Sequence, residues 1–272
     1  MDYQTIKVSI DAGVATLLLN RPDRANSMNQ PMWDELPRAF DELDKQPEVR
    51  VVVLTGAGEH FCAGIDITML AELQRTTGAD DPCAGRAREN LRNWILKMQD
   101  TVNALERCRK PVIAAIHGAC MGAGVDLITA CDLRYCAEGV RIAVKEIDMG
   151  LVADVGVLQR LPKLVGEGVT RDMAYTGREV GAKEAERNGL VNRAYPTHAK
   201  MMKAVTELAR KLAAKSPLAL RGTKHVITHG RDHSVAESME YVALWNAAML
   251  MSEDLAEAVM AFQKKRPPTF RD

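Results

Sequence analysis

Two short apolar runs, each ending in glycine and each followed by a glycine-containing segment, most constrain how this chain folds. RVVVLTG (50–56) and PVIAAIHG (111–118) are predicted to be short buried strands. Helices are predicted around them, because PMWDELPRAFDELDKQ (31–46) has amphipathic apolar spacing and a long helix is expected from about residue 89 to 107. Strands that alternate with helices indicate an α/β fold with a largely parallel sheet.

The pattern changes near Pro196, after which only helical segments are predicted. We therefore expect two parts, an α/β core over residues 1–196 and a helical region over residues 197–272. Near the N-terminus, IKVSI and ATLLLN are predicted to form a hairpin across the turn at residues 11–13. The Gly-, Asp- and Thr-containing stretch at 75–86 is predicted to be a loop.

The charge balance and the cysteines limit which binding partners and which cellular compartment are expected. Lys plus Arg and Asp plus Glu both total 36, so no net field attracts nucleic acid or an anionic membrane surface. No uninterrupted apolar run reaches membrane-spanning length. The six cysteines form no CxxC pair, and neither a signal peptide nor a C-terminal Ser-Lys-Leu address is visible. These features predict a cytoplasmic location.

Glycine-containing segments follow both buried strands and have the composition of ligand-binding turns. HFCAGIDI (60–67) and GACMGAG (118–124) contain small residues that let backbone N–H groups approach a ligand oxygen. The second segment leads into a predicted helix, whose N-terminus presents unpaired N–H groups. Two such sites facing each other would form an oxyanion hole. Either motif alone is more often an ordinary glycine-rich turn, since isolated glycine patterns are weak signals.

Three acidic residues, Asp126, Glu146 and Asp154, have apolar or glycine neighbours in the sequence. Carboxyl groups in apolar surroundings have raised pKa values and can exchange protons near neutral pH. Structural explanations stay open for each of them: Asp126 as a helix cap or satisfied core residue, Glu146 as a surface pair beside Lys145, and Asp154 as a helix cap.

The motifs, taken in order, resemble the crotonase (enoyl-CoA hydratase/isomerase) superfamily. They are LNRPDRANSMN, HFCAGIDI, KPVIAAIHGACMGAGVDL, ACDLRYCAE and YTGREVGAKEAERNGLVNRAYP, and the resemblance covers about residues 5 to 197. It implies a crotonase-like spiral of ββα repeats with a C-terminal α-helical trimerisation region. It also implies acyl-CoA thioester substrates and trimers or dimers of trimers. No metal or redox cofactor is expected, since coenzyme A is part of the substrate.

The resemblance also implies roles for individual residues. The two oxyanion N–H donors would be Ile65 and Ala123, where most relatives have glycine at the second position. The coenzyme A site would be lined, largely through backbone atoms, by Arg24, Ala25, Ala63, Gly64, Asp66 and Gly122. Lys264 or Lys265 would approach the coenzyme A phosphates, with a solvated helix end as the alternative.

The identities of the acidic residues at positions 126, 146 and 154 distinguish the activities within the family. Hydratases of the family have two glutamates at the positions of 126 and 146 and commonly glycine at that of 154, whereas this chain has Asp126 and Asp154. The set Asp126, Glu146 and Asp154 looks like that of the Δ3,5-Δ2,4-dienoyl-CoA isomerases. This implies conversion of 3,5-dienoyl-CoA to 2,4-dienoyl-CoA in fatty acid beta-oxidation. We expect Asp154 to remove the C2 proton, Glu146 to protonate C6 and Asp126 to support them.

Several alternatives remain at this point. The first is an enoyl-CoA hydratase or a Δ3-Δ2-enoyl-CoA isomerase, and a remote one is a noncatalytic crotonase-like binding protein.

His225, His229 and His233 have helical spacing that suggests metal ligands, but Gly230 is expected to end that helix. Asp132 and Arg134 are predicted to form an internal ion pair.

Overall fold

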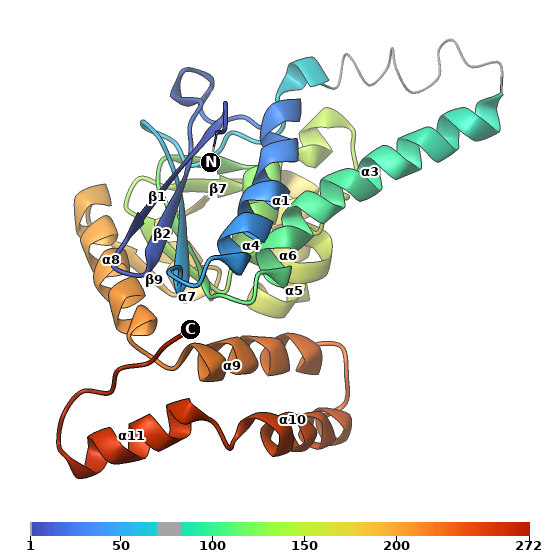
Figure 1. The fold of residues 1–272 in the computed structure, drawn as a ribbon. Helices are drawn as coiled ribbons and strands as arrows, with labels where there is room; N and C mark the ends of the chain where they lie inside the picture. Colours follow the sequence, from blue (N-terminus) through green and yellow to red (C-terminus); the bar gives the residue numbers. More distant parts are fainter. Residues whose placement is uncertain (1, 70–82) are drawn as a thin grey trace.

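The computed structural model describes residues 2–69 and 83–272 (Figure 1). The N-terminal part contains β1 (Ile6–Asp11), β2 (Val14–Leu19), η1 (Pro22–Arg24), α1 (Gln30–Lys45), β3 (Val51–Gly56) and α3 (Ala84–Arg107). The central part contains β4 (Val112–Ile116), β5 (Ala119–Met121), α4 (Ala123–Ala130), β6 (Leu133–Ala137), β7 (Arg141–Ala143) and η2 (Glu146–Met149). It continues with α5 (Val157–Val165), α6 (Glu167–Thr176), β8 (Val180–Gly181), α7 (Ala182–Arg187) and β9 (Arg193–Tyr195). The last helices are α8 (His198–Ala213), α9 (Pro217–Gly230), α10 (Val235–Met249) and α11 (Glu253–Gln263).

The predicted α/β fold with a largely parallel sheet is confirmed. A six-stranded sheet has the order β1-β2-β3-β4-β6-β9, and every neighbouring pair is parallel except the β1–β2 hairpin. The hairpin turns at Ala12 and Gly13, whose positive φ values of 47° and 80° suit a tight turn between twisted strands. A second sheet of three strands has the order β5-β7-β8.

Helices cover both faces of the six-stranded sheet. The strands β3 and β4 are buried along their whole length, as predicted for their near-continuous apolar sequences. On one face, α8 contributes Met201, Val205 and Ala209 to a buried cluster with strand residues such as Val53 and Ile113. The predicted boundary at residue 196 thus precedes a helix that packs on the sheet. The helices that leave the core begin with α9 (Figure 1).

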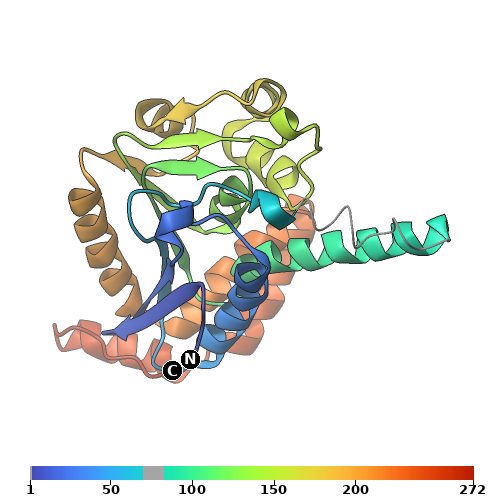
Figure 2. The ribbon, with the colours of Figure 1, turned by 90° about the horizontal axis from the view of Figure 1, so that it is seen from above.

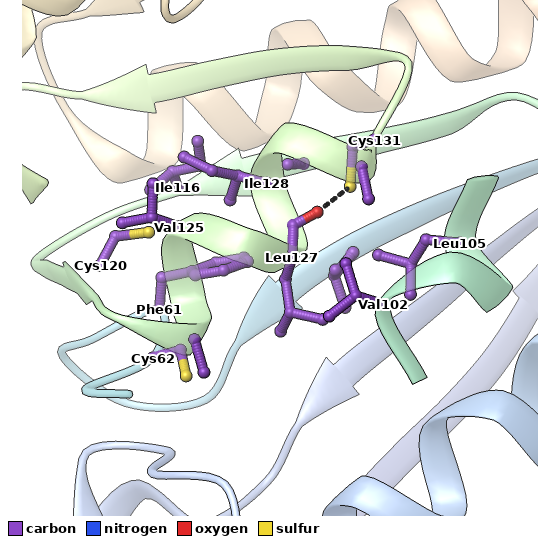
Figure 3. Packing of buried hydrophobic residues seen from close by; sticks show 14 of the residues in the cluster. Phe61, Cys62, Val102, Leu105, Ile116, Cys120, Val125, Leu127, Ile128 and Cys131 are labelled. Carbon is purple, nitrogen blue, oxygen red and sulfur yellow. Dashed lines mark hydrogen bonds between the residues drawn. The ribbon is translucent and has the colours of Figure 1, made fainter. Parts of the chain in front are cut away.

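The opposite face of the sheet packs against the main core, which contains α4. All eight residues of α4 are buried, and Leu127 lies among Phe61, Val102 and other apolar side chains (Figure 3). Cys131 Sγ donates to the Leu127 carbonyl at 3.3 Å, so that thiol belongs to the end of the helix. Because the other residues of α4 are apolar or small, the whole helix is buried and carries the carboxyl group of Asp126 into the protein interior.

Helices α3 and α10 carry long exposed surfaces. The N-terminal half of α3 extends away from the rest of the molecule, and its buried residues begin at Met98 (Figure 2). Helix α10 has no buried residue, although it includes apolar side chains such as Met239 and Leu244. Along residues 2–69 and 83–272, no helix is long and apolar enough to span a membrane. Of the loop predicted at 75–86, residues 75–82 lie outside the described residues, and the prediction is wrong for residues 84–86, which form the first turn of α3.

The predicted ion pair between Asp132 and Arg134 is wrong. Arg134 instead donates to the carbonyl oxygens of Leu190 and Cys131 at 2.8 and 2.7 Å. Asp132 accepts a hydrogen bond from Lys224 Nζ at 2.8 Å, which joins α9 to the core. Residues two apart in a strand share one face, but β6 begins only at Leu133, so the strand period does not extend to Asp132.

Replacing Lys224 with methionine should lower the free energy of unfolding by about 3 kcal/mol, because the buried ammonium group holds α9 to Asp132. Lys224 Nζ also lies 3.1 Å from the Lys110 carbonyl, so the change leaves several polar atoms without their donor. Urea unfolding measures the difference. The exposed pair Arg210–Asp11 is the control, since Arg210→Met should change stability by less than about 1 kcal/mol. Equal effects of the two substitutions would contradict the claim that Lys224 holds α9 to the core.

Candidate active site

An apolar cavity of about 640 Å³ lies between α3, the two glycine turns and the segment that follows η2. Its apolar wall includes Trp33, Leu91, Trp94, Ile95, Met98 and Val155. Polar residues at the same cavity include Glu146 and Asp154, two of the three acids singled out from the sequence. The third, Asp126, is not among the lining residues and lies behind the wall.

The two glycine turns predicted as ligand-binding segments meet at this cavity. Gly64 and Gly122 have φ values of +97° and +49°, a region that favours glycine. A β-carbon added at Gly64 would lie 3.2 Å from the Met121 carbonyl oxygen and 3.8 Å from Ala123 N. One added at Gly122 would lie 3.8 Å from the Gly64 Cα. The absence of side chains therefore allows the two turns to face each other closely.

Local hydrogen bonding orients the two candidate oxyanion donors. Ala123 is the first residue of α4, so its N–H has no acceptor within that helix. Around Ile65, Met28 N donates to the Gly64 carbonyl at 2.8 Å, and Asp66 N donates to the Met28 carbonyl at 3.0 Å. In such a parallel pairing the N–H of the residue between the bonded ones points the other way. Both Ile65 and Ala123 line the cavity, as predicted.

Glu146 begins η2 and lies beside the oxyanion turns. Its Oε1 atom is 3.3 Å from the position that a β-carbon would occupy at Gly122. Its Oε2 atom is buried and has no hydrogen-bond partner among the described residues. Burial, together with the charge of Asp154, raises the pKa of Glu146. The surface-pair alternative does not hold, because Lys145 pairs with Asp148 at 2.8 Å.

Asp126 is completely buried within α4. Its Oδ1 atom accepts a hydrogen bond from Val157 N at 2.6 Å, and its Oδ2 atom has no partner among the described residues. Burial raises the pKa of Asp126 well above its usual value, and the nearby Glu146 adds to this rise. Asp126 caps no part of its own helix. It instead binds the first N–H of α5, and so connects α4 to the turn that carries Asp154.

Asp154 lies on the exposed wall of the cavity, just before α5. Desolvation by the surrounding wall raises its pKa. The residue at the N-terminal cap of α5 is Gly156, which makes no side-chain capping bond, so Asp154 is not the cap of this helix. Gln99 Nε2 of α3 donates to the Asp154 carbonyl at 2.7 Å. The structure thus brings two acids to one apolar cavity, with the third bonded to the turn that holds the second.

Most of the residues expected to line the coenzyme A site line this cavity. Arg24, Ala63, Gly64, Asp66 and Gly122 are among its lining residues. Ala25 is not among them, but it has a left-handed backbone with φ of 48°, and its carbonyl accepts from Ala63 N at 2.9 Å. Lys264 and Lys265 follow α11, are exposed, and do not line the cavity.

Sequence reasoning missed the partner of Asp66. Arg21 Nη2 lies 2.9 Å from the Asp66 carboxylate. Burial opposes ionisation of Asp66, but hydrogen bonds from Thr68 and Arg21 outweigh it and hold its pKa below the usual value. The pair fixes the 60–67 turn against the segment from residue 20 to 28. Arg21 and Asp66 are 45 residues apart in the sequence, so their contact could not be predicted from local patterns.

The histidines at 225, 229 and 233 do not form a metal centre. Helix α9 ends at Gly230, as predicted, and His229 stacks on His233 and on Tyr241 of α10 with ring centroids 3.8 and 3.9 Å apart. Across residues 2–69 and 83–272, no three His, Cys, Asp or Glu side chains are arranged to hold a metal ion. These rings pack α10 on α9.

Comparison with known proteins agrees with this geometry. Residues 9–272 match the sequence profile described as Enoyl-CoA hydratase/isomerase. The chain belongs to this family. It is 45% identical to a peroxisomal Δ(3,5)-Δ(2,4)-dienoyl-CoA isomerase of Arabidopsis thaliana, over 98% of the chain and 97% of the relative. It is also 45% identical to the mitochondrial enzyme of that name from Homo sapiens, over 95% of the chain and 79% of the relative.

The fold prediction is confirmed by solved structures of the family. The crystal structure of an enoyl-CoA hydratase from Bacillus anthracis superposes with a TM-score of 0.88 at 32% identity, covering 98% of this chain and 99% of that one. The crotonase-like fold expected from the motifs is therefore correct. The predicted resemblance to dienoyl-CoA isomerases is confirmed by the two curated relatives.

The predicted cytoplasmic location is wrong, because the dienoyl-CoA isomerases that this chain resembles are named peroxisomal or mitochondrial. Unpaired cysteines distinguish reducing from oxidising environments and do not separate one reducing compartment from another.

Proposed function

We propose that this chain is an isomerase that converts 3,5-dienoyl-CoA to 2,4-dienoyl-CoA. The observation that carries the proposal is that Glu146 and Asp154, both with raised pKa values, line one apolar cavity with the two glycine turns. The names of the relatives at about 45% identity agree with it. The assay is formation of a conjugated 2,4-dienoyl absorbance from 3,5-octadienoyl-CoA, and a purified, folded protein that forms none would contradict the proposal.

The chemistry requires an oxyanion site and two proton carriers. The thioester oxygen would bind at the Ile65 and Ala123 N–H groups, which stabilise the negative charge that develops when C2 loses a proton. The electron pair of the broken C2–H bond forms the C2–C3 double bond and shifts the others, so the pair at C6 takes up a proton. One carboxylate accepts the C2 proton and another carboxyl group donates to C6. The net change is a proton moved from C2 to C6.

The position of Glu146 supports assigning it to C2, the reverse of the order expected from the sequence. C2 is bonded to the thioester carbon, so the group that acts there must lie beside the oxyanion donors. Glu146 lies beside Gly122, which directly precedes the donor Ala123. Asp154 lies on the outer wall and suits C6, which is farther from the carbonyl. Asp126 would support Asp154 through the hydrogen bond to Val157 N.

The pH dependence follows from these roles. Glu146 must be ionised to accept a proton, so activity falls as the pH drops below its pKa, which burial raises above the ordinary value of about 4.3. Asp154 must be protonated, so activity also falls as the pH rises above its raised pKa. We expect a bell-shaped profile of kcat/KM whose limbs belong to the coupled carboxyl groups. An acidic limb at or below the ordinary glutamate pKa would contradict the proposed role of Glu146.

We also propose that the chain acts in fatty acid beta-oxidation, without a metal or redox cofactor, as a trimer or a dimer of trimers. The exposed apolar side chains of the C-terminal helices support self-association, with Met239 63%, Leu244 62% and Phe262 86% exposed. Such an assembly would have three or six times the 29.9 kDa chain mass.

Substituting Leu244 with aspartate should dissociate this assembly, because an unpaired charge would be buried in each interface. Light scattering after size-exclusion chromatography would give the mass. The wild type is expected at a multiple of the chain mass and Leu244→Asp at the mass of one chain, with Glu167→Gln on α6 as an unaffected control. A single-chain mass for the wild type at micromolar concentration would contradict the proposal.

A further inference from the structure

The turn between Asp154 and Val157 is fixed by neighbouring helices. Gln99 of α3 donates to the Asp154 carbonyl at 2.7 Å, and Asp126 of α4 accepts from Val157 N at 2.6 Å. These two contacts hold the ends of the turn. The contact at its middle comes from α5 itself, where the guanidinium group of Arg160 lies against Gly156.

Gly156 allows this contact in two ways. Its φ of +126° is a conformation that side chains disfavour. A β-carbon at this position would overlap with Arg160 Nη1 and lie 3.3 Å from Arg160 Cζ. The guanidinium group therefore rests directly on the backbone of the turn that carries Asp154.

The other side of the guanidinium group is bound to α3. Arg160 Nε and Nη2 donate to Glu106 Oε2 at 2.9 and 2.7 Å, and Nη2 also donates to Asn103 Oδ1 at 2.7 Å. The Arg160 side chain is only 13% exposed. A planar group with several bonds to one helix has little freedom to move. Arg160 thus forms a rigid bridge between α3 and the turn.

Arg160 lies outside the acyl cavity. It lines a separate polar cavity of about 360 Å³ on the other side of Asp154, together with Asn103 and Glu106. It contacts no residue of the acyl cavity wall except through the turn, although its charge also counteracts the rise that burial causes in the pKa of Asp126. Glu146, by contrast, belongs to η2 and lies beside Gly122, so the bridge does not hold it.

We propose that Arg160 is a positioning residue that sets where Asp154 stands in the acyl cavity, and that it serves proton delivery at C6 but not proton removal at C2. The inference rests on the proposed isomerase function. It predicts that the two proton transfers can be separated by a substitution that touches neither acid.

The test uses Arg160→Met and 3,5-octadienoyl-CoA in deuterium oxide. A displacement of the reacting group by about 1 Å can cost about 10²-fold in rate, so kcat for 2,4-dienoyl formation should fall by about that factor with KM unchanged. The C2 proton should still be removed by Glu146, whose carboxyl group then exchanges with solvent. Deuterium should therefore enter C2 of the recovered substrate at the wild-type rate or faster. Unchanged isomerisation, or equal losses of isomerisation and C2 exchange, would overturn the inference.

Matched variants keep the result interpretable. Arg171→Met removes an exposed arginine that pairs with Glu167 on α6, and both rates should stay at wild-type values. Arg160→Lys retains the charge but not the forked geometry, and should recover part of the lost kcat. If Arg160→Met does not fold, Asn103→Ala removes one partner of the guanidinium group and should give a smaller loss of the same kind. Equal losses in both reactions for Asn103→Ala would also overturn the inference. A wild type without isomerase activity would instead refute the proposed function.

Discussion

Replacing Asp154 with asparagine should lower kcat for conversion of 3,5-dienoyl-CoA by about 10²–10⁴-fold, the contribution typical of a positioned proton donor. Asparagine keeps the shape of the side chain but has no carboxyl proton for C6. The oxyanion turns and Glu146 remain, so the C2 proton should still leave and return. Deuterium from solvent should accumulate at C2 of the unreacted substrate, as measured by mass spectrometry.

Asp172→Asn is the matched control, because Asp172 is an acid on α6 that pairs with Arg178 and does not line the cavity. It should leave kcat unchanged. Glu146→Gln should give the complementary result, with both isomerisation and C2 exchange lost. If Asp154→Asn lost C2 exchange while Glu146→Gln kept it, the order of the two acids would be the one expected from the sequence. Full isomerase activity of Asp154→Asn would contradict the mechanism as a whole.

Replacing Ala123 with proline should lower kcat by about 10²–10³-fold, because proline has no N–H to donate to the thioester oxygen. Ala123 is the first residue of α4, a position where proline suits the helix and disturbs no intrahelical hydrogen bond. The substitution therefore removes one oxyanion donor with little effect on the fold. Steady-state kinetics with 3,5-octadienoyl-CoA and thermal unfolding of the same sample test the two parts of this expectation.

The control for this substitution is Ala182→Pro. Ala182 begins α7, also follows a glycine, and does not line the cavity. The kcat of Ala182→Pro should match that of the wild type. If Ala123→Pro were fully folded and fully active, the Ala123 N–H would not be an oxyanion donor.

The sequence was most informative where function depends on local backbone. The buried strands Val51–Gly56 and Val112–Ile116 and the turns at Gly64 and Gly122 could be predicted, since short apolar runs and glycine leave few alternatives. The burial of Asp126 was also foreseeable, because its neighbours in α4 are apolar or small. Motif order added the cavity residues Ile65 and Ala123.

Contacts between distant segments could not be predicted. Asp132 pairs with Lys224, 92 residues away, and Arg160 binds Glu106, 54 residues away. Both contacts depend on how the helices are placed in space. The spacing of apolar residues predicts a helix but not its position. The assignment of Glu146 to C2 has the same origin, because only its closeness to Gly122 supports it. Helix α8 had a visible apolar face, but its packing on the sheet required the fold.

The most direct test of the central claim compares isomerisation and hydration by one enzyme preparation. Offered separately, 3,5-octadienoyl-CoA and a 2-enoyl-CoA of equal chain length report on the two activities by conjugated-diene absorbance and by loss of the enoyl absorbance. The presence of Asp154, together with aspartate rather than glutamate at position 126, predicts rapid formation of the 2,4-dienoyl product and little hydration. Rapid hydration of the 2-enoyl-CoA without formation of the 2,4-dienoyl product would contradict the account.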